Sequence, residues 1–370
     1  MDKKELLSLI ALQHIPGVGS ITAKRLLENV GSATKLFEQR DELPSIIPQI
    51  QPSLIKALDC PAAHQRAEKE LEFIDKHHIT CIGYHDADYP SRLRECEDAP
   101  TLLFYRGNTS LNPRRVVSIV GTRKCTDYGR DLCENFVRDL AALCPDTLIV
   151  SGLAYGIDVC AHRAAIKYGL PTVGVLAHGL DRIYPSVHRN TAAHMVDCGG
   201  LLTEYPSHTE PERSNFLQRN RIVAGIADAT IIVESAAKGG SLVTANIANS
   251  YGRDCFTFPG RTTDLSSEGC HRLIRHNQAA LITSASDFVE AMMWDAKQKI
   301  QAIQQSLFPE LNEEESCIVR TLEKYTEGAA INTLVAETNF PVHRLSAILF
   351  ELELRDIVLP LAGSIYKLRR

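Results

Sequence analysis

The sequence has 370 residues, an apolar fraction of 44% and a formal net charge of −5. This length divides into two or three domains of ordinary globular composition. Because the net charge is negative, binding to nucleic acid would need a local cluster of cations. No run of about 20 apolar residues exists, which excludes a membrane-spanning helix.

The eleven cysteines are scattered along the chain and form no CxxC pair. We therefore expect free thiols in a reducing compartment, and neither a disulfide framework nor a zinc site. The histidines also lack paired metal spacing, so we predict no metal ion and no other cofactor. The first residues lack the long apolar run and the cleavage site of a signal peptide, which predicts a cytoplasmic protein without a membrane partner.

Residues 1–76 are predicted to form a small helical domain. Apolar residues keep helical spacing near the start and again over Ala63–Lys76, on both sides of a proline-rich stretch. Between the first two helices, residues 15–24 (IPGVGSITAK) form a glycine turn that resembles a helix-hairpin-helix. Its amides could hold a DNA phosphate, although a tight turn that requires positive φ at glycine is the simpler interpretation.

Residues 77–293 are predicted to form the central domain, a mostly parallel sheet with helices on both faces. From Val116 onward, short apolar segments alternate with amphipathic ones, which is the pattern of βαβ units. Such sheets bind ligands in the loops at the carboxyl ends of their strands. The predicted strands are 79–84, 101–105, 116–120, 148–150, 172–176, 201–204, 229–233, 255–258 and 280–283.

Several of these loops combine glycine with cations or hydroxyl groups. Glycine turns at helix N-termini expose backbone N–H groups that attract anions. We also interpret residues 216–221 as an arginine-rich turn, whose phenylalanine and cations suit a polyanion with stackable bases. The predicted nucleic-acid-binding residues are Gly121, Thr122, Arg123, Lys124, Ser151, Gly152, Phe216, Arg219, Asn220, Arg221, Lys238, Gly239, Gly240 and Ser241.

A catalytic interpretation would join Ser151, His162 and Asp158 in a hydrolytic triad. However, Asp158 and His162 are four residues apart, which is ordinary helix geometry, and no G-x-S-x-G motif is present. We therefore interpret Ser151 as a helix cap and the other two as structural, and we predict no catalytic residue. Neither G-x-G-x-x-G nor a Walker A motif occurs. The loop Ala177–Pro185 could be a lid or a surface-binding loop.

Residues 294–315 are predicted to be a linker, and residues 316–370 a winged-helix domain of three helices and a two-stranded wing. The third helix, VHRLSAILFELELRD, is mostly apolar and has only Arg344 and Arg355 as basic residues. Reading a DNA groove needs cationic and amide side chains. A protein-contact or structural role is therefore favoured for this domain.

Five segments, in this order, resemble the motif set of the DprA (Smf) family, the DNA-processing proteins of natural transformation. They are residues 120–123, 151–162, 179–185, 216–225 and 240–260. Several long motifs in one order are more specific than any single motif. Leu217, His188 and Gln278-Ala279 depart from the family pattern.

The resemblance implies an extended Rossmann-like core that binds single-stranded DNA and forms a homodimer. It also implies protection of incoming DNA and loading of a RecA-type recombinase onto it, without catalysis. Carried over residue by residue, Arg123 and residues 219–221 would hold phosphates, and Phe216 would stack on a base. Gly121, Ser151, Gly152, Gly240 and Ser241 would shape the pocket.

Two other functions stay open. Phosphoribohydrolases of the LOG type share the sheet and the glycine turn, but residues 242–246 (LVTAN) lack the catalytic glutamate of that family. A nucleotide-sensing module that controls the winged helix would use the same pocket, and only a binding assay separates it from a DNA-binding protein.

Overall fold

The computed structural model of the chain describes residues 1–294, 311–325, 328–355, 357–361 and 363–368. These residues form two compact units, divided near residue 297. Most of the predicted linker 294–315 lies outside the described residues.

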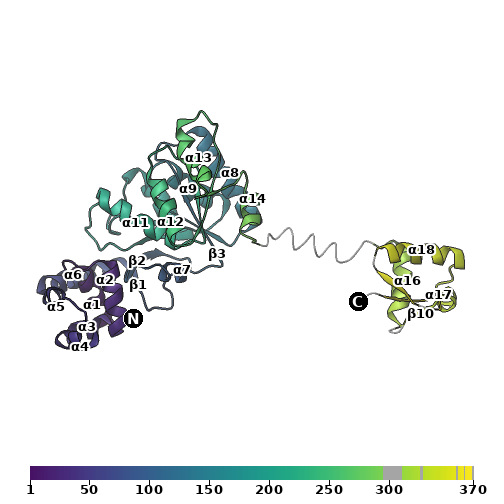
Figure 1. Ribbon diagram of the computed structural model, residues 1–370, viewed down its shortest axis with the longest axis horizontal. Coiled ribbons are helices and arrows are strands. Elements are labelled where there is room, and N and C mark those ends of the chain that lie inside the picture. Colours follow the sequence, from purple (N-terminus) through teal and green to yellow (C-terminus); the bar gives the residue numbers. More distant parts are fainter. Residues whose placement is uncertain (295–310, 326–327, 356, 362, 369–370) are drawn as a thin grey trace. The chain divides into compact units, whose positions relative to one another are not determined.

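The first unit is built on one sheet of nine strands (Figure 1). Its order is β1-β2-β6-β5-β4-β3-β7-β8-β9, in which β1, β2 and β6 pair antiparallel and all other neighbours pair parallel. The prediction of a mostly parallel α/β sheet is therefore confirmed. The strands are β1 (Thr80–Gly83), β2 (Leu102–Gly107), β3 (Arg115–Val120), β4 (Thr147–Ser151), β5 (Thr172–Val175), β6 (Gly199–Thr203), β7 (Ala229–Ile232), β8 (Asp254–Thr257) and β9 (Ala280–Leu281).

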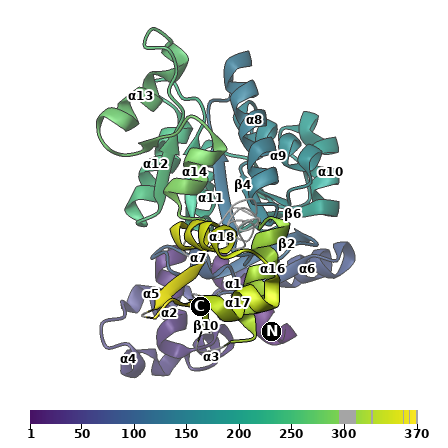
Figure 2. The same cartoon turned by 90° about the vertical axis from the view of Figure 1, so that its right-hand side faces the viewer.

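Both faces of the sheet are buried under helices. Successive side chains of a strand point to opposite faces, so each strand contributes to the hydrophobic core on both sides of the sheet. On β3, Val116 and Val120 pack on the face covered by α11 and α12, whereas Val117 and Ile119 pack under α8, α9 and α14. Figure 2 shows α8, α9 and α10 side by side. The helices of this part are α7 (Ser91–Arg94), α8 (Asp127–Leu143), α9 (Ile157–Tyr168), α10 (Arg189–Cys198), α11 (Arg213–Gly225), α12 (Gly240–Ser250), α13 (Glu268–Arg275) and α14 (Ala285–Ala291), with 3-10 turns η2 (Ser186–His188) and η3 (Leu265–Ser267).

The N-terminal helices share a hydrophobic core with the edge of the sheet. Leu102 and Phe104 of β2 are buried in the same cluster as Leu9, Ile10 and Leu27. This helical segment and the sheet therefore belong to one compact unit. The helices are α1 (Lys3–Gln13), α2 (Ser20–Val30), α3 (Ala33–Glu38), α4 (Leu43–Ile46), α5 (Pro52–Ala57) and α6 (Pro61–His77), with a 3-10 turn η1 (Arg40–Glu42).

The glycine turn between α1 and α2 has the backbone that its sequence predicts. Gly17 has a φ of +80°, a conformation that costs glycine little. No polar side chain caps α2, which begins after Gly19.

The second unit has a core of its own, formed by residues such as Ile318, Leu334, Leu349 and Val358. Its three helices and a small antiparallel sheet, ordered β10-β12-β11, have the winged-helix arrangement that the sequence predicts. The elements are α16 (Glu313–Glu323), β10 (Ala329–Ala330), α17 (Ile331–Thr338), α18 (Val342–Leu354), β11 (Val358–Leu361) and β12 (Ile365–Leu368).

Candidate nucleic-acid interface

A cavity of about 720 Å³ lies at the carboxyl ends of β3 and β7. The chain runs outward from β3 through β4 and β5 on one side of the sheet and then returns to place β7 on the other side. Ligands of open α/β sheets bind at such a switch point. All predicted site residues line this cavity except Ser151, Gly152 and Arg221; the predicted residues that do line it are Gly121, Thr122, Arg123, Lys124, Phe216, Arg219, Asn220, Lys238, Gly239, Gly240 and Ser241.

The loop after β3 is held from two sides. The Thr122 amide donates to the Glu234 carbonyl at 2.7 Å, and the Thr122 carbonyl accepts from the Ile157 amide at 3.2 Å. A Cβ on Gly156, where φ is +76°, would lie 2.1 Å from the Thr122 carbonyl oxygen, so only glycine fits. The side chains of Arg123 and Lys124 are left exposed beside the cavity.

Glu234 fixes the same loop and was not predicted from the sequence. This buried carboxylate follows β7 and accepts from the Thr126 amide at 2.9 Å and from the Thr126 hydroxyl at 2.7 Å. Thr126 in turn caps α8 by accepting from the Gly129 amide at 3.1 Å. An acidic residue directly after a buried strand is the signal that could have indicated this role.

The prediction of an arginine-rich turn at residues 216–221 is wrong, because these residues lie within α11. Ile222 and Val223 continue the helix and are buried against the sheet. Since a helix turns about 100° per residue, Arg219 and Arg221 project in very different directions. The helix therefore presents Phe216, Arg219 and Asn220 to the cavity and directs Arg221 elsewhere.

Arg221 is an internal structural residue. Its guanidinium pairs with the Glu204 carboxylate and donates to the Asp98 carbonyl at 2.7 Å and to the Ser20 hydroxyl at 3.1 Å. It thereby ties α2, α11 and the end of β6 together. The expectation that Arg221 holds a phosphate does not agree with this geometry.

Arg219 lies at the inner wall of the cavity and is only 3% exposed. Its Nη1 donates to the Val175 carbonyl at 3.1 Å. Burial lowers the pKa of this guanidinium, and the nearby Asp158 carboxylate opposes that shift. Burial likewise raises the pKa of Asp158, partly offset by Arg219. Arg219 thus supplies a fixed positive charge behind the cavity.

Gly152 contributes by the space that it leaves. A Cβ at this position would lie 1.6 Å from Nη1 of Arg219. Gly152 therefore allows the Arg219 side chain to pack against the end of β4. This explains a glycine at that position even though Gly152 does not line the cavity.

Two aromatic rings and two cations are grouped in the cavity. The guanidinium carbons of Arg123 and Arg219 lie 5.2 Å and 5.9 Å from the centroid of the half-buried Phe216 ring. Tyr184, which was not among the predicted site residues, lines the same cavity, with its ring centroid 5.8 Å from that of Phe216. Aromatic rings beside cations are the usual elements of a single-strand binding groove.

The glycine loop before α12 leaves its backbone available. The N-cap is Gly239, which has no side chain to accept a hydrogen bond from the first amides of the helix. The Ser241 hydroxyl donates instead to the Ser235 hydroxyl at 2.8 Å. Lys238 is exposed beside this helix N-terminus. The lysine charge and the helix N-terminus together favour a negatively charged ligand.

The residues of the triad hypothesis do not bond to one another. The Ser151 hydroxyl donates to the Ile119 carbonyl at 2.5 Å, so Ser151 is not the expected helix cap. His162 Nδ1 pairs with the Thr172 hydroxyl at 2.7 Å, and burial lowers the pKa of His162 to about 3. Asp158 accepts from the Ala154 amide at 3.4 Å. This arrangement offers no nucleophile and base in contact.

Two further findings concern metals and membranes. Among the described residues, no group of three or more His, Cys, Asp or Glu side chains is placed to hold a metal ion. None of the helices in this part of the chain is long and apolar enough to cross a membrane.

Comparison with known proteins gives consistent matches. The sequence model for DNA recombination-mediator protein A matches residues 80–293, and that for the DprA winged helix domain matches residues 306–364. DNA processing protein DprA of Streptococcus pneumoniae is 40% identical over 202 residues, covering 55% of this chain and 70% of that protein. Protein Smf of Escherichia coli K12 is 33% identical over 297 residues, covering 80% and 78%.

Two solved structures are also similar. The X-ray structure of DprA from Streptococcus pneumoniae has a TM-score of 0.58 and 32% identity, covering 74% of this chain and 98% of that one. A structure that describes the single-stranded DNA binding mode of DNA processing protein A from Helicobacter pylori has a TM-score of 0.53 and 29% identity, covering 58% and 95%.

Proposed function

This chain belongs to the family of DNA recombination-mediator protein A (DprA/Smf), and on that premise we propose that it binds single-stranded DNA in the cavity at the ends of β3 and β7. The observation that carries the proposal is the grouping of exposed cations and aromatic rings around one cavity. Arg123, Lys124, Arg213 and Lys238 are exposed there, beside Phe216 and Tyr184.

The chemistry of this group fits a flexible polyanion with accessible bases. Cations and free amides would bind phosphates, and the rings would stack on bases of any sequence. In duplex DNA the faces of the bases are stacked and not accessible. A duplex could therefore contact only the cations of the site. The protein should therefore prefer single strands and read little sequence.

The wider role is part of the same proposal. The protein would protect incoming single-stranded DNA during natural transformation and load a RecA-type recombinase onto it, acting as a homodimer through the sheet-containing unit. It would do so as a cytoplasmic protein without catalysing a reaction. Relatives are named DNA processing proteins, which supports a role in DNA processing.

The test is fluorescence anisotropy with a labelled 30-mer of dT and a matched 30-base-pair duplex over a salt series. With about four phosphates neutralised, log K for the single strand should fall with log[salt] at a slope of about −3. A mononucleotide at a hundredfold excess should not compete. Arg123→Glu should weaken binding at least tenfold, whereas Lys69→Glu on the exposed surface of α6 serves as the charge-matched control.

Equal affinity for a mononucleotide and the 30-mer would overturn the DNA proposal in favour of a nucleotide-sensing module. Conversion of a nucleoside monophosphate to a free base would favour a phosphoribohydrolase of the LOG type.

A further inference from the structure

We propose that Tyr184 is a second base-stacking residue, held beside Phe216 by a polar network that joins the loops after β5 and β6. This proposal rests on the proposed function, because it names a specific contact to single-stranded DNA. Tyr184 lines the cavity, and 47% of its surface is exposed. A ring that served only to fill the core would be buried.

The surroundings of the two rings differ. Phe216 is half-buried and already has the guanidinium groups of Arg123 and Arg219 within 5.2 Å and 5.9 Å of its ring centroid. A base that stacks on Phe216 has to share or displace these cation–π contacts, each of which has its own favourable energy. Among the described residues, no cation lies over the Tyr184 ring. Of these two rings at the cavity, Tyr184 is therefore the more accessible to an arriving base.

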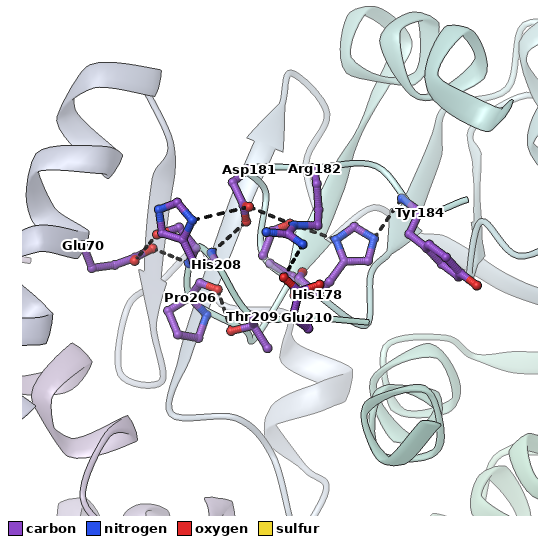
Figure 3. A network of polar contacts seen from close by, with 12 residues as sticks. Glu70, His178, Asp181, Arg182, Tyr184, Pro206, His208, Thr209 and Glu210 are labelled. Carbon is purple, nitrogen blue, oxygen red and sulfur yellow. Dashed lines mark hydrogen bonds and ion pairs between the residues drawn. The ribbon is translucent and has the colours of Figure 1, made fainter. Parts of the chain in front are cut away.

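The backbone of Tyr184 is fixed by His178, which is buried. The Tyr184 amide donates to Nε2 of His178 at 3.3 Å, and Nδ1 of His178 lies 2.8 Å from the Gly179 carbonyl. Because Nε2 accepts, the proton must be on Nδ1, which then donates to Gly179. In Figure 3 the Tyr184 ring points away from this network.

The same loop is attached to the loop after β6 through Asp181 and Arg182. Asp181 accepts from the His208 amide at 2.9 Å, and Arg182 pairs with Asp181 at 3.0 Å and with Glu210 at 2.6 Å (Figure 3). Asp181 and Glu210 therefore link the loop after β5 to the loop after β6.

The second loop is anchored in turn to α6. Glu70, which is 1% exposed, accepts from the Ser207 amide at 2.8 Å and from the Ser207 hydroxyl at 2.5 Å. This loop leads directly into α11, which begins at Arg213 and carries Phe216. The network thus determines how the two aromatic rings are placed relative to each other.

The geometry points to stacking of two different bases of one strand, and not to a single base enclosed between the rings. The ring centroids are 5.8 Å apart and the ring planes meet at 57°, so no flat slot exists between them. Two rings inclined in this way would hold neighbouring bases unstacked from each other. Duplex DNA cannot provide such bases.

The test compares Tyr184→Leu and Tyr184→Phe with wild type, using dT 30-mers for affinity and a 30-mer with internal 2-aminopurine for stacking. Leucine keeps apolar bulk but lacks a π face, so affinity should fall about 5- to 150-fold, and the change in 2-aminopurine fluorescence on binding should decrease. Phenylalanine keeps the ring, so affinity should stay within about twofold. The salt slope should not change, because no charge is altered.

Tyr168→Leu, at the opposite end of α9 from the cavity, is the matched control and should bind as wild type. Asp181→Asn should weaken binding and reduce the 2-aminopurine response, because Tyr184 and Phe216 would lose their fixed spacing.

The proposal is overturned if Tyr184→Leu binds as wild type, or if Tyr184→Phe loses as much affinity as Tyr184→Leu. If wild type itself fails to bind the 30-mer, the proposed function fails first. If wild type binds and Arg123→Glu does not, the function stands and the outcome at Tyr184 is decided separately.

Discussion

Arg219 and Arg221 lie two residues apart in α11, and both are largely buried, but they have different roles. Arg219 forms the inner wall of the cavity beside Asp158, whereas Arg221 pairs with Glu204 in the contact between α11 and α2. Charge at the accessible surface comes instead from residues such as Arg123 and Lys238. At the level of single residues, burial separates the cations that fix the site from those that can meet a ligand.

This difference predicts contrasting effects of substitution. Arg219→Ala should lower the free energy of unfolding by about 3 kcal/mol, because the buried Asp158 carboxylate would lose the positive charge of Arg219, which favours its charged form. Arg123→Ala should change it by less than about 0.5 kcal/mol, because the side chain is exposed. Urea unfolding of both variants measures this. Equal stability of the two would show that Arg219 does not contribute as a buried charge.

His162 predicts a dependence of stability on pH. Its pKa is lowered to about 3 in the folded protein by burial, against an ordinary value of 6.5. The unfolded chain therefore binds the proton that the folded chain refuses, and stability is complete above pH 6.5 and lost as pH falls towards 3. From pH 7 to pH 5 this one group should cost about 2 kcal/mol.

Urea unfolding at pH 7 and pH 5 checks the effect of His162. In His162→Gln the loss between the two pH values should be smaller by about that amount, even if the variant is less stable at both. An unchanged pH dependence would assign the effect to other groups, such as His178, whose pKa is also lowered by burial.

At the scale of elements, the loop between β3 and α8 depends on a partner from a distant part of the chain. Glu234, at the end of β7, holds both the amide and the hydroxyl of Thr126, and its carbonyl holds Thr122. The loop that carries Arg123 and Lys124 is therefore positioned by the neighbouring strand. Local sequence does not contain this information.

Glu234→Ala should lower the free energy of unfolding by about 2–3 kcal/mol, because two donors at Thr126 lose their acceptor. It should also weaken binding of single-stranded DNA, since the loop that carries Arg123 and Lys124 would no longer be fixed. Thr126→Ser keeps both donors and should behave as wild type. Chemical denaturation and anisotropy check the two effects, and full affinity in Glu234→Ala would remove Glu234 from the positioning role.

At the scale of the whole molecule, the two compact units have separate hydrophobic cores. The N-terminal helices are different, because they share a core with β2. The helical segment therefore belongs to the same compact unit as the sheet, whereas the winged helix forms the second compact unit.

Removal of residues 295–370 should leave the melting temperature of the first unit nearly unchanged and its affinity for single-stranded DNA within about threefold. The reason is that, among the described residues, the two units have separate hydrophobic cores and the cavity is lined by residues of the first unit. Removal of residues 1–76 should yield an unstable or aggregating protein, since Leu102 and Phe104 would be exposed. Calorimetry and light scattering distinguish these outcomes. A truncation after residue 294 that unfolds would contradict the division into two units.

The sequence by itself determined the strands, the loops with glycine and cations, the winged-helix plan and half of the cavity lining. These are local properties, since apolar periodicity and glycine turns are encoded within a few residues. Only the tertiary structure decided that residues 216–221 are helical, that Arg221 points away from the cavity, and that Glu234 and Tyr184 belong to the site. The direction and burial of a side chain depend on neighbours far away in the chain, and a one-dimensional pattern does not specify those neighbours.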